Sequence, residues 1–199
     1  MSKSAYRVLF IFILFAIIAG GLYLVDRVTK RTTPVGRAMP AFALTSLNGN
    51  RISERDLCGK KYGLLLFSVD CRFCKDELAK IKPLIPAVSS RLPIIVASID
   101  GIEDCQKITR DLSLPFDIYP NAKDLAKQLG VRSVPTIILV DARGNIAYIQ
   151  SGSRNEKFLE IVFERFTKGE ALSEPLLRDA YMKHTNSSKE PEGCWQRCL

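Results

Sequence analysis

Histidine is nearly absent from this 199-residue chain: there is one, His184, in a polar C-terminal stretch. We therefore expect no histidine-based catalysis.

Acidic residues are absent before Asp26. Although Lys and Arg outnumber Asp and Glu by 29 to 21, no basic stripe is interleaved with aromatic residues. Such a scattered excess is typical of a solvated basic surface, so no nucleic-acid partner is expected. No internal repeat is visible.

Charged residues are also missing from Val8 to Val25, a stretch that is almost entirely apolar. As an α-helix it would reach roughly 27 Å, which is close to the thickness of a bilayer's hydrocarbon core. We predict a single transmembrane helix, with residues 1–28 as a lipid-contacting anchor. The alternative is a cleaved secretory signal, which Ile17 disfavours because a small residue is wanted there if cleavage follows Ala19. Basic residues flank both ends, so charge alone does not orient the span.

Six cysteines are more than a reduced cytosolic protein of this size needs. The even count favours an oxidising compartment, where disulfides persist. We expect Cys58 and Cys105 to be small buried hydrophobes, although they could pair with each other. Cys194 and Cys198, close to the C-terminus, form a possible second disulfide.

The order of apolar runs predicts one α/β domain. We divide the chain into an anchor (1–28), a linker (29–40) rich in Pro and Gly, the domain (41–170), and a C-terminal extension with a Cys-rich tail (171–199). Pro83 and Pro86 should kink or end the helix in which they fall. The patterns predict strands at 42–44, 49–52, 62–69, 93–99, 136–140 and 146–150, and helices at 53–57, 75–85, 103–112, 123–129, 155–167 and, weakly, 175–182. This order gives a mixed central sheet with helices on both faces.

The stretch Cys71-Arg72-Phe73-Cys74 lies between a buried-strand pattern and a helical one. A cysteine that opens a helix meets unpaired N–H groups and the positive end of the helix dipole, which favour the thiolate over the thiol. Cys71 is therefore the candidate nucleophile, and Cys74, three residues on, can close a disulfide with it. This pattern is typical of thiol-disulfide exchange.

Two further features support that chemistry. Glu77 lies three residues after Cys74, where a partly buried carboxylate could take the proton of Cys74. A solvated helix glutamate is the equally good alternative. Val134-Pro135-Thr136 precedes a predicted strand, and a cis bond at Pro135 would turn the backbone of Val134 towards a substrate segment beside Cys71.

These motifs, together with residues 35–42 and 141–144, resemble the membrane-anchored thioredoxin-fold thiol-disulfide oxidoreductases of the TlpA and ResA type. Within that group, the segments 96–101 and 153–169 are most similar to the methylamine-utilisation protein MauD.

The resemblance implies a thioredoxin-like fold, with Cys71, Cys74, Glu77 and cis-Pro135 as catalytic residues. By the same resemblance, Val134, Thr136, Arg72 and Phe73 would contact substrate, and no cofactor is needed beyond the disulfide. The domain would face the periplasm from the inner membrane and act on a disulfide-containing protein, such as a disulfide-rich periplasmic enzyme subunit, with a membrane redox partner. Asp70, Arg72 and Lys80 depart from residues common in such proteins, which leaves the redox potential open.

Two other classes stay open. Cys71 and Cys74 could join Cys194 and Cys198 in a zinc site, although the long separation and the loose tail disfavour it. A redox-inactive partner-binding module is the third possibility, and the intact Cys71–Cys74 pair argues against it.

Overall fold

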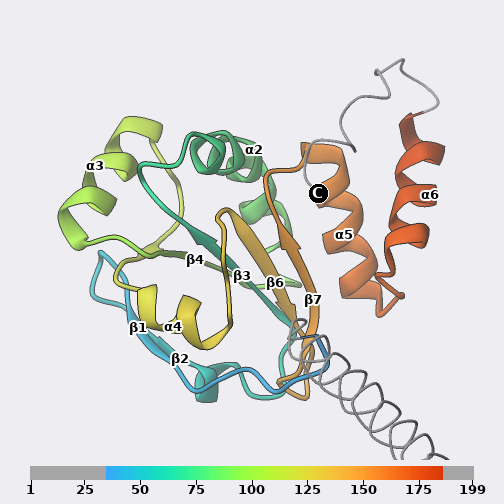
Figure 1. Ribbon diagram of the computed structural model, residues 1–199, viewed down its shortest axis with the longest axis horizontal. Helices are drawn as coiled ribbons and strands as arrows, with labels where there is room; N and C mark the ends of the chain where they lie inside the picture. The colour runs from blue at the N-terminus through green and yellow to red at the C-terminus, as the bar shows by residue number, and fades with distance from the viewer. Residues whose placement is uncertain (1–34, 186–199) are drawn as a thin grey trace, which may run out of the picture. The chain divides into compact units, whose positions relative to one another are not determined.

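The computed structural model describes residues 35–185. The predicted span Val8–Val25 and the cysteines Cys194 and Cys198 lie outside these residues. Between residues 35 and 185, no helix has the length and apolarity needed to cross a membrane. Figure 1 shows the elements, which are in chain order β1 (Ala43–Thr45), β2 (Arg51–Ser53), η1 (Glu54–Leu57), β3 (Tyr62–Phe67), α2 (Arg72–Val88), β4 (Ile94–Ser98), α3 (Ile102–Leu112), β5 (Ile118–Tyr119), α4 (Lys123–Gln128), β6 (Thr136–Val140), β7 (Ile146–Ser151), α5 (Glu156–Lys168) and α6 (Glu174–Thr185).

The central sheet is mixed, as predicted, and has the order β5-β4-β3-β6-β7. β3 is parallel to β4 and antiparallel to β6, so that Leu65 lies opposite Val96 on one side and Ile137 on the other. β1 and β2 form a separate antiparallel pair. β5 was not predicted, because two residues are too short to show the alternation by which strands are recognised.

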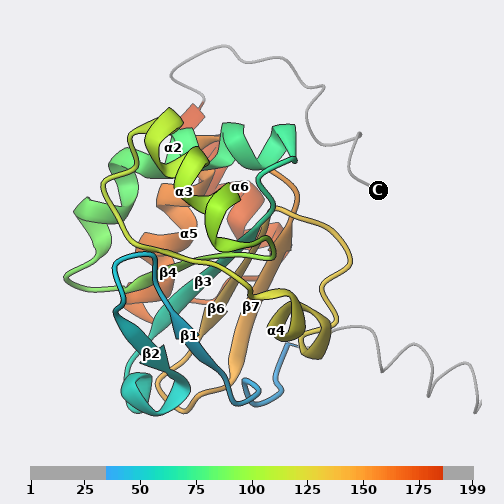
Figure 2. The same ribbon diagram turned by 90° about the vertical axis from the view of Figure 1, so that its left-hand side faces the viewer.

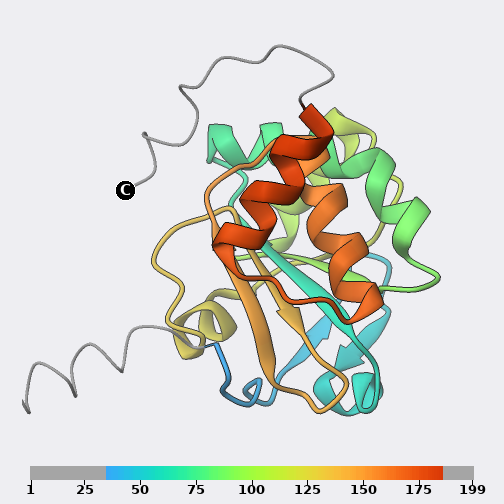
Figure 3. The same cartoon turned by 90° about the vertical axis from the view of Figure 1, so that its right-hand side faces the viewer.

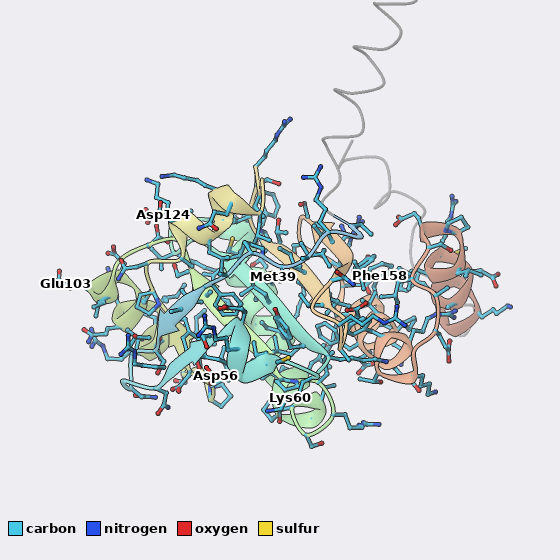
Figure 4. All side chains as sticks on the ribbon, turned by 90° about the horizontal axis from the view of Figure 1, so that it is seen from below. Met39, Asp56, Lys60, Glu103, Asp124 and Phe158 are labelled. Carbon is cyan, nitrogen blue, oxygen red and sulfur yellow. The ribbon has the colours of Figure 1, made fainter. Side chains whose placement is uncertain are left out.

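Side chains of β3 alternate between two cores, as the pleat of a strand requires. Leu65 and Phe67 pack in the core that α2, α3, α5 and α6 cover. Leu64 and Leu66 face the opposite core, which holds residues of α4 and of the β1–β2 pair. Figure 2 shows these two layers on either side of the sheet. Met39 is buried, whereas Glu103 and Asp124 are exposed; Figure 4 labels all three in the view from below.

α2 continues through Pro83 and Pro86 to Val88, so neither proline ends it, and the helix runs beyond the predicted end at Ile85. Leu84 and Ile85, between the two prolines, are both buried in the core. Their packing outweighs the loss of intrahelical N–H donors at the two prolines.

The packed core extends into α6, where a weak helix was predicted. Leu177 is fully buried, and Tyr181 contacts the ring of Phe158 on α5 edge to face. Figure 3 shows α5 and α6 side by side. At the other end, the backbone N–H of Gly36 donates to the carbonyl of Ile146, which ties the chain to the sheet from residue 36 onward.

Lys61 should stabilise the fold by capping α5. Its ammonium donates to the carbonyls of Phe166 (2.9 Å) and Thr167 (3.2 Å) at the negative end of the helix dipole. Lys61→Met should lower the free energy of unfolding in urea by about 1–2 kcal/mol. Lys60→Met, at the exposed neighbouring position, should change it by less than about 0.5 kcal/mol. Equal effects of the two variants would contradict the capping role.

Candidate active site

Cys71 is the N-cap of α2, as predicted. Its backbone is extended (φ −84°, ψ 115°), and its sulfur accepts a hydrogen bond of 3.3 Å from the backbone N–H of Cys74. The same N–H also donates to the backbone carbonyl of Cys71 at 3.1 Å, so it is shared between two acceptors, as is common at helix ends. Cys71 is half-buried, so its sulfur at the start of α2 is open to a substrate.

Cys74 has the opposite environment. Its side chain is fully buried. Burial, with smaller contributions from the hydrogen bond to Cys71 and the charges of Cys71 and Glu77, raises the pKa of Cys74 to about 12. At neutral pH Cys74 is therefore a thiol that cannot attack until its proton is removed.

Glu77 is buried beside Cys74, so the solvated alternative is wrong. It lies one helical turn after Cys74 on the same face of α2. Burial raises the pKa of Glu77, and hydrogen bonds from the hydroxyl of Ser153 (2.7 Å) and the backbone N–H of Arg154 (3.1 Å) oppose that effect. Both bonds go to Oε2. Oε1 has no hydrogen-bond partner among residues 35–185.

The loop before β6 lies against Cys71. The peptide bond between Val134 and Pro135 is cis, as predicted, and the thiol of Cys71 donates to the carbonyl of Val134 at 3.5 Å. Thr136 is buried, and its hydroxyl donates to the carbonyl of Ser133 (2.7 Å), which holds the loop from within. The structure therefore brings Cys71, Val134 and Pro135 together, while the side chain of Thr136 faces inward.

Arg72 and Phe73 occupy the first turn of α2 and are both exposed. Phe73 has 65% of its surface open to solvent, which is unusual for a large apolar residue. An exposed ring beside the nucleophile offers apolar contact to a bound protein segment.

Sequence reasoning missed the residues that support the site from a distance. Ser153 and Arg154 follow β7 and are more than 70 residues away from Glu77. Asp100, after β4, accepts from the backbone N–H of Val69 at 2.7 Å and so fixes the turn that leads to Cys71. A polar residue at the end of a strand was the only signal available, and it is too common to identify a site.

The remaining described cysteines differ from each other. Cys105 is buried, as predicted, whereas Cys58 is exposed, so the prediction was wrong for Cys58. Both are free thiols. Within residues 35–185, no group of three His, Cys, Asp or Glu residues is arranged to hold a metal ion.

This chain is similar to several known proteins that are named for thiol-disulfide chemistry or for the thioredoxin fold. A family model described as the AhpC/TSA family matches residues 35–149. The thioredoxin-like protein YneN of Bacillus subtilis (strain 168) is 27% identical over 129 residues, which are 63% of this chain and 76% of that protein. The thiol-disulfide oxidoreductase ResA of Bacillus anthracis is 25% identical over 169 residues, or 83% of this chain and 98% of ResA.

Among solved structures, a thiol:disulfide interchange protein of Chlorobium tepidum TLS superposes with a TM-score of 0.59 at 17% identity. The match covers 65% of this chain and 95% of that one. At this identity the likeness shows a shared fold.

The opposite environments of the two cysteines predict their alkylation. Iodoacetamide at neutral pH should modify Cys71, because it is accessible, while Cys74 should react at least about tenfold more slowly in the native protein. Peptide mapping by mass spectrometry checks this, with Cys105 as a buried control and Cys58 as an exposed one. Labelling of Cys74 as fast as Cys71 would contradict the burial of Cys74.

The buried carboxylate should destabilise the fold at neutral pH. The pKa of Glu77 is higher in the folded protein than in the unfolded chain, where it is about 4.3. The folded state is therefore most favoured below the unfolded pKa, and this stabilisation is lost as the pH rises through the folded pKa. Glu77→Gln removes this loss. It should raise the free energy of unfolding at pH 7 and have little effect below about pH 4.

Urea denaturation at the two pH values measures this difference. Asp76→Asn, at an exposed position of the same helix, removes a carboxylate without removing a buried charge. A gain in stability for Glu77→Gln that is the same at both pH values would show that burial of the charge is not its cause.

Proposed function

From the premise that this chain belongs to the AhpC/TSA family and is a thiol-disulfide oxidoreductase, we propose that it is tethered to the inner membrane and acts on disulfides of periplasmic proteins. Its thioredoxin-like fold is the predicted one. The observation that supports the proposed chemistry best is the pairing of an accessible Cys71 at the start of α2 with a buried Cys74 beside a buried Glu77.

The exchange proceeds in two steps. The thiolate of Cys71 attacks a sulfur of the substrate disulfide, that disulfide breaks, and one substrate sulfur leaves as a thiolate. Cys74 then gives its proton to the carboxylate of Glu77, and its sulfur attacks Cys71. The bond between Cys71 and the substrate breaks, the Cys71–Cys74 disulfide forms, and the substrate has gained two electrons. In reverse, the same steps form a disulfide in the substrate.

Substrate binding in this proposal uses the surface around Cys71. The backbone of Val134 beside cis-Pro135 offers hydrogen bonds to an extended protein segment, and the exposed side chains of Arg72 and Phe73 line the approach. We propose a disulfide-rich periplasmic enzyme subunit as the substrate, in keeping with the MauD resemblance. A membrane redox partner restores the starting state of the pair after each turnover.

The tether in this proposal is the apolar stretch Val8–Val25, with the domain on the periplasmic side. The even number of cysteines and the resemblance of the sequence motifs to membrane-anchored oxidoreductases support it. Holding the domain at the membrane surface raises its effective concentration near a membrane-bound redox partner.

The test is to trap the substrate. Cys74→Ala should accumulate mixed disulfides through Cys71, because the resolving thiol is gone. In cells that express the full chain, these adducts should appear in the membrane fraction, disappear on reduction, and contain periplasmic proteins identified by mass spectrometry. Cys71→Ala should trap nothing.

A second form of Cys74→Ala without residues 1–28, exported with a cleavable signal, separates the parts of the proposal. It should still trap partners, but in the soluble fraction. The absence of adducts from both forms would refute disulfide exchange, and full-length adducts found only with cytoplasmic proteins would refute the proposed location.

A further inference from the structure

A short hydrogen-bonded chain leads from the surface of α2 to the buried carboxylate. The ammonium of Lys80 donates to the hydroxyl of Ser153 at 3.0 Å, and that hydroxyl donates to Oε2 of Glu77 at 2.7 Å. Ser153 belongs to the segment after β7, so the chain joins two parts of the fold more than 70 residues apart. Lys80 is half-buried, whereas Glu77 is fully buried.

The direction of this chain is fixed by its donors. A lysine ammonium has only donors, and a serine hydroxyl has one proton. Ser153 must therefore accept from Lys80 and point its own proton at Glu77. A chain with this polarity favours a charged carboxylate, and the backbone N–H of Arg154 at 3.1 Å adds a second donor to the same oxygen.

These hydrogen bonds also determine which oxygen of Glu77 is left without a donor. Both donors approach Oε2, while Oε1 has no hydrogen-bond partner among residues 35–185. A buried carboxylate oxygen without a donor is costly unless it serves a purpose. Cys74, one turn earlier on the same helix face and equally buried, is the nearby group with a proton to give.

We propose that Lys80 and Ser153 are positioning residues that hold Glu77 in its charged, proton-accepting form, so that Cys74 can be deprotonated when it resolves the mixed disulfide. The inference rests on the proposed function. The groups that face Glu77 are Lys80 and Cys74 on α2 and Arg154 after β7. Lys80 and Arg154 both favour the charge that burial opposes.

Their role concerns one proton. The proton on the sulfur of Cys74 passes to Glu77, the sulfur forms its bond to Cys71, and the departing substrate sulfur leaves with the electron pair and is protonated by water. Without the chain, burial would leave Glu77 protonated over more of the pH range, and a carboxylic acid cannot take the proton.

Stopped-flow kinetics with 5,5′-dithiobis(2-nitrobenzoate) separates the two steps. The full chain in detergent, with Cys58, Cys194 and Cys198 replaced by serine, releases one thionitrobenzoate when Cys71 attacks and a second when Cys74 resolves the mixed disulfide. Lys80→Met and Ser153→Ala should slow the second release about tenfold at neutral pH and move its pH profile to higher pH, because Glu77 loses support for its charge. The first release should not change.

Matched variants test whether Lys80 and Ser153 act on the second release through Glu77. Lys80→Arg and Ser153→Thr keep the charge and the hydroxyl and should restore most of the rate, whereas Lys75→Met, an exposed position on the same helix, should have no effect. In a Glu77→Gln background, Lys80→Met should cause no further slowing, because its effect runs through Glu77.

The outcomes distinguish the inference from the proposed function. If both releases occur but the pH profiles of Lys80→Met and Ser153→Ala overlay that of the parent, the chain does not set the charge of Glu77 and the inference is wrong while disulfide exchange stands. If the parent protein releases no thionitrobenzoate, the proposed function fails and the inference with it.

Discussion

The burial of Cys74 and Glu77 together is the constraint on which the chemistry of this protein depends. Both side chains are fully removed from solvent, one turn apart on α2. A second negative charge in such a place is expensive, because desolvation and repulsion both oppose it. The two groups are therefore unfavourable as a doubly charged pair, and in the proposed exchange Cys74 ionises by giving its proton to Glu77. Cys71 is half-buried and lies outside this constraint, so the proposed exchange begins with its sulfur.

Three segments that are distant in the sequence converge to hold this arrangement. Asp100, at the end of β4, fixes the turn before Cys71. The loop before β6 places the carbonyl of Val134 at the thiol of Cys71. The segment after β7 links the two halves of the site: the N–H of Gly152 donates to the carbonyl of Pro135 at 2.8 Å, and Ser153 donates to Glu77. One short segment therefore contacts both the loop before β6 and the buried carboxylate.

The features that local sequence signals predicted are those that local physics determines. A cysteine pair between a buried strand and a helical pattern was enough to predict that Cys71 would begin α2. The central strand β3, buried on both faces, was predicted from its continuous apolar run. The cis bond at Pro135 needed the family resemblance as well, since few X-Pro bonds are cis.

What could not be predicted depends on contacts between distant residues. The burial of Glu77 is decided by what packs over α2, and Ser153 is an ordinary loop serine until the fold places its hydroxyl at Glu77. The continuation of α2 past Pro83 and Pro86 has the same origin, because the packing of the helix against the core outweighs the low helix propensity of the two prolines.

Lys80 shows how a departure from the pattern of similar proteins gains a physical meaning. In the sequence it was one of three departures from similar proteins that left the redox potential open. In the structure it supplies a cation that orients Ser153 towards Glu77. A buried carboxylate without such support would tend to stay protonated, and the thiol beside it would stay unreactive. In the proposed exchange, the balance between burial and the Lys80–Ser153 hydrogen bonds therefore sets how readily Cys74 reacts, while Cys71 lies outside these hydrogen bonds.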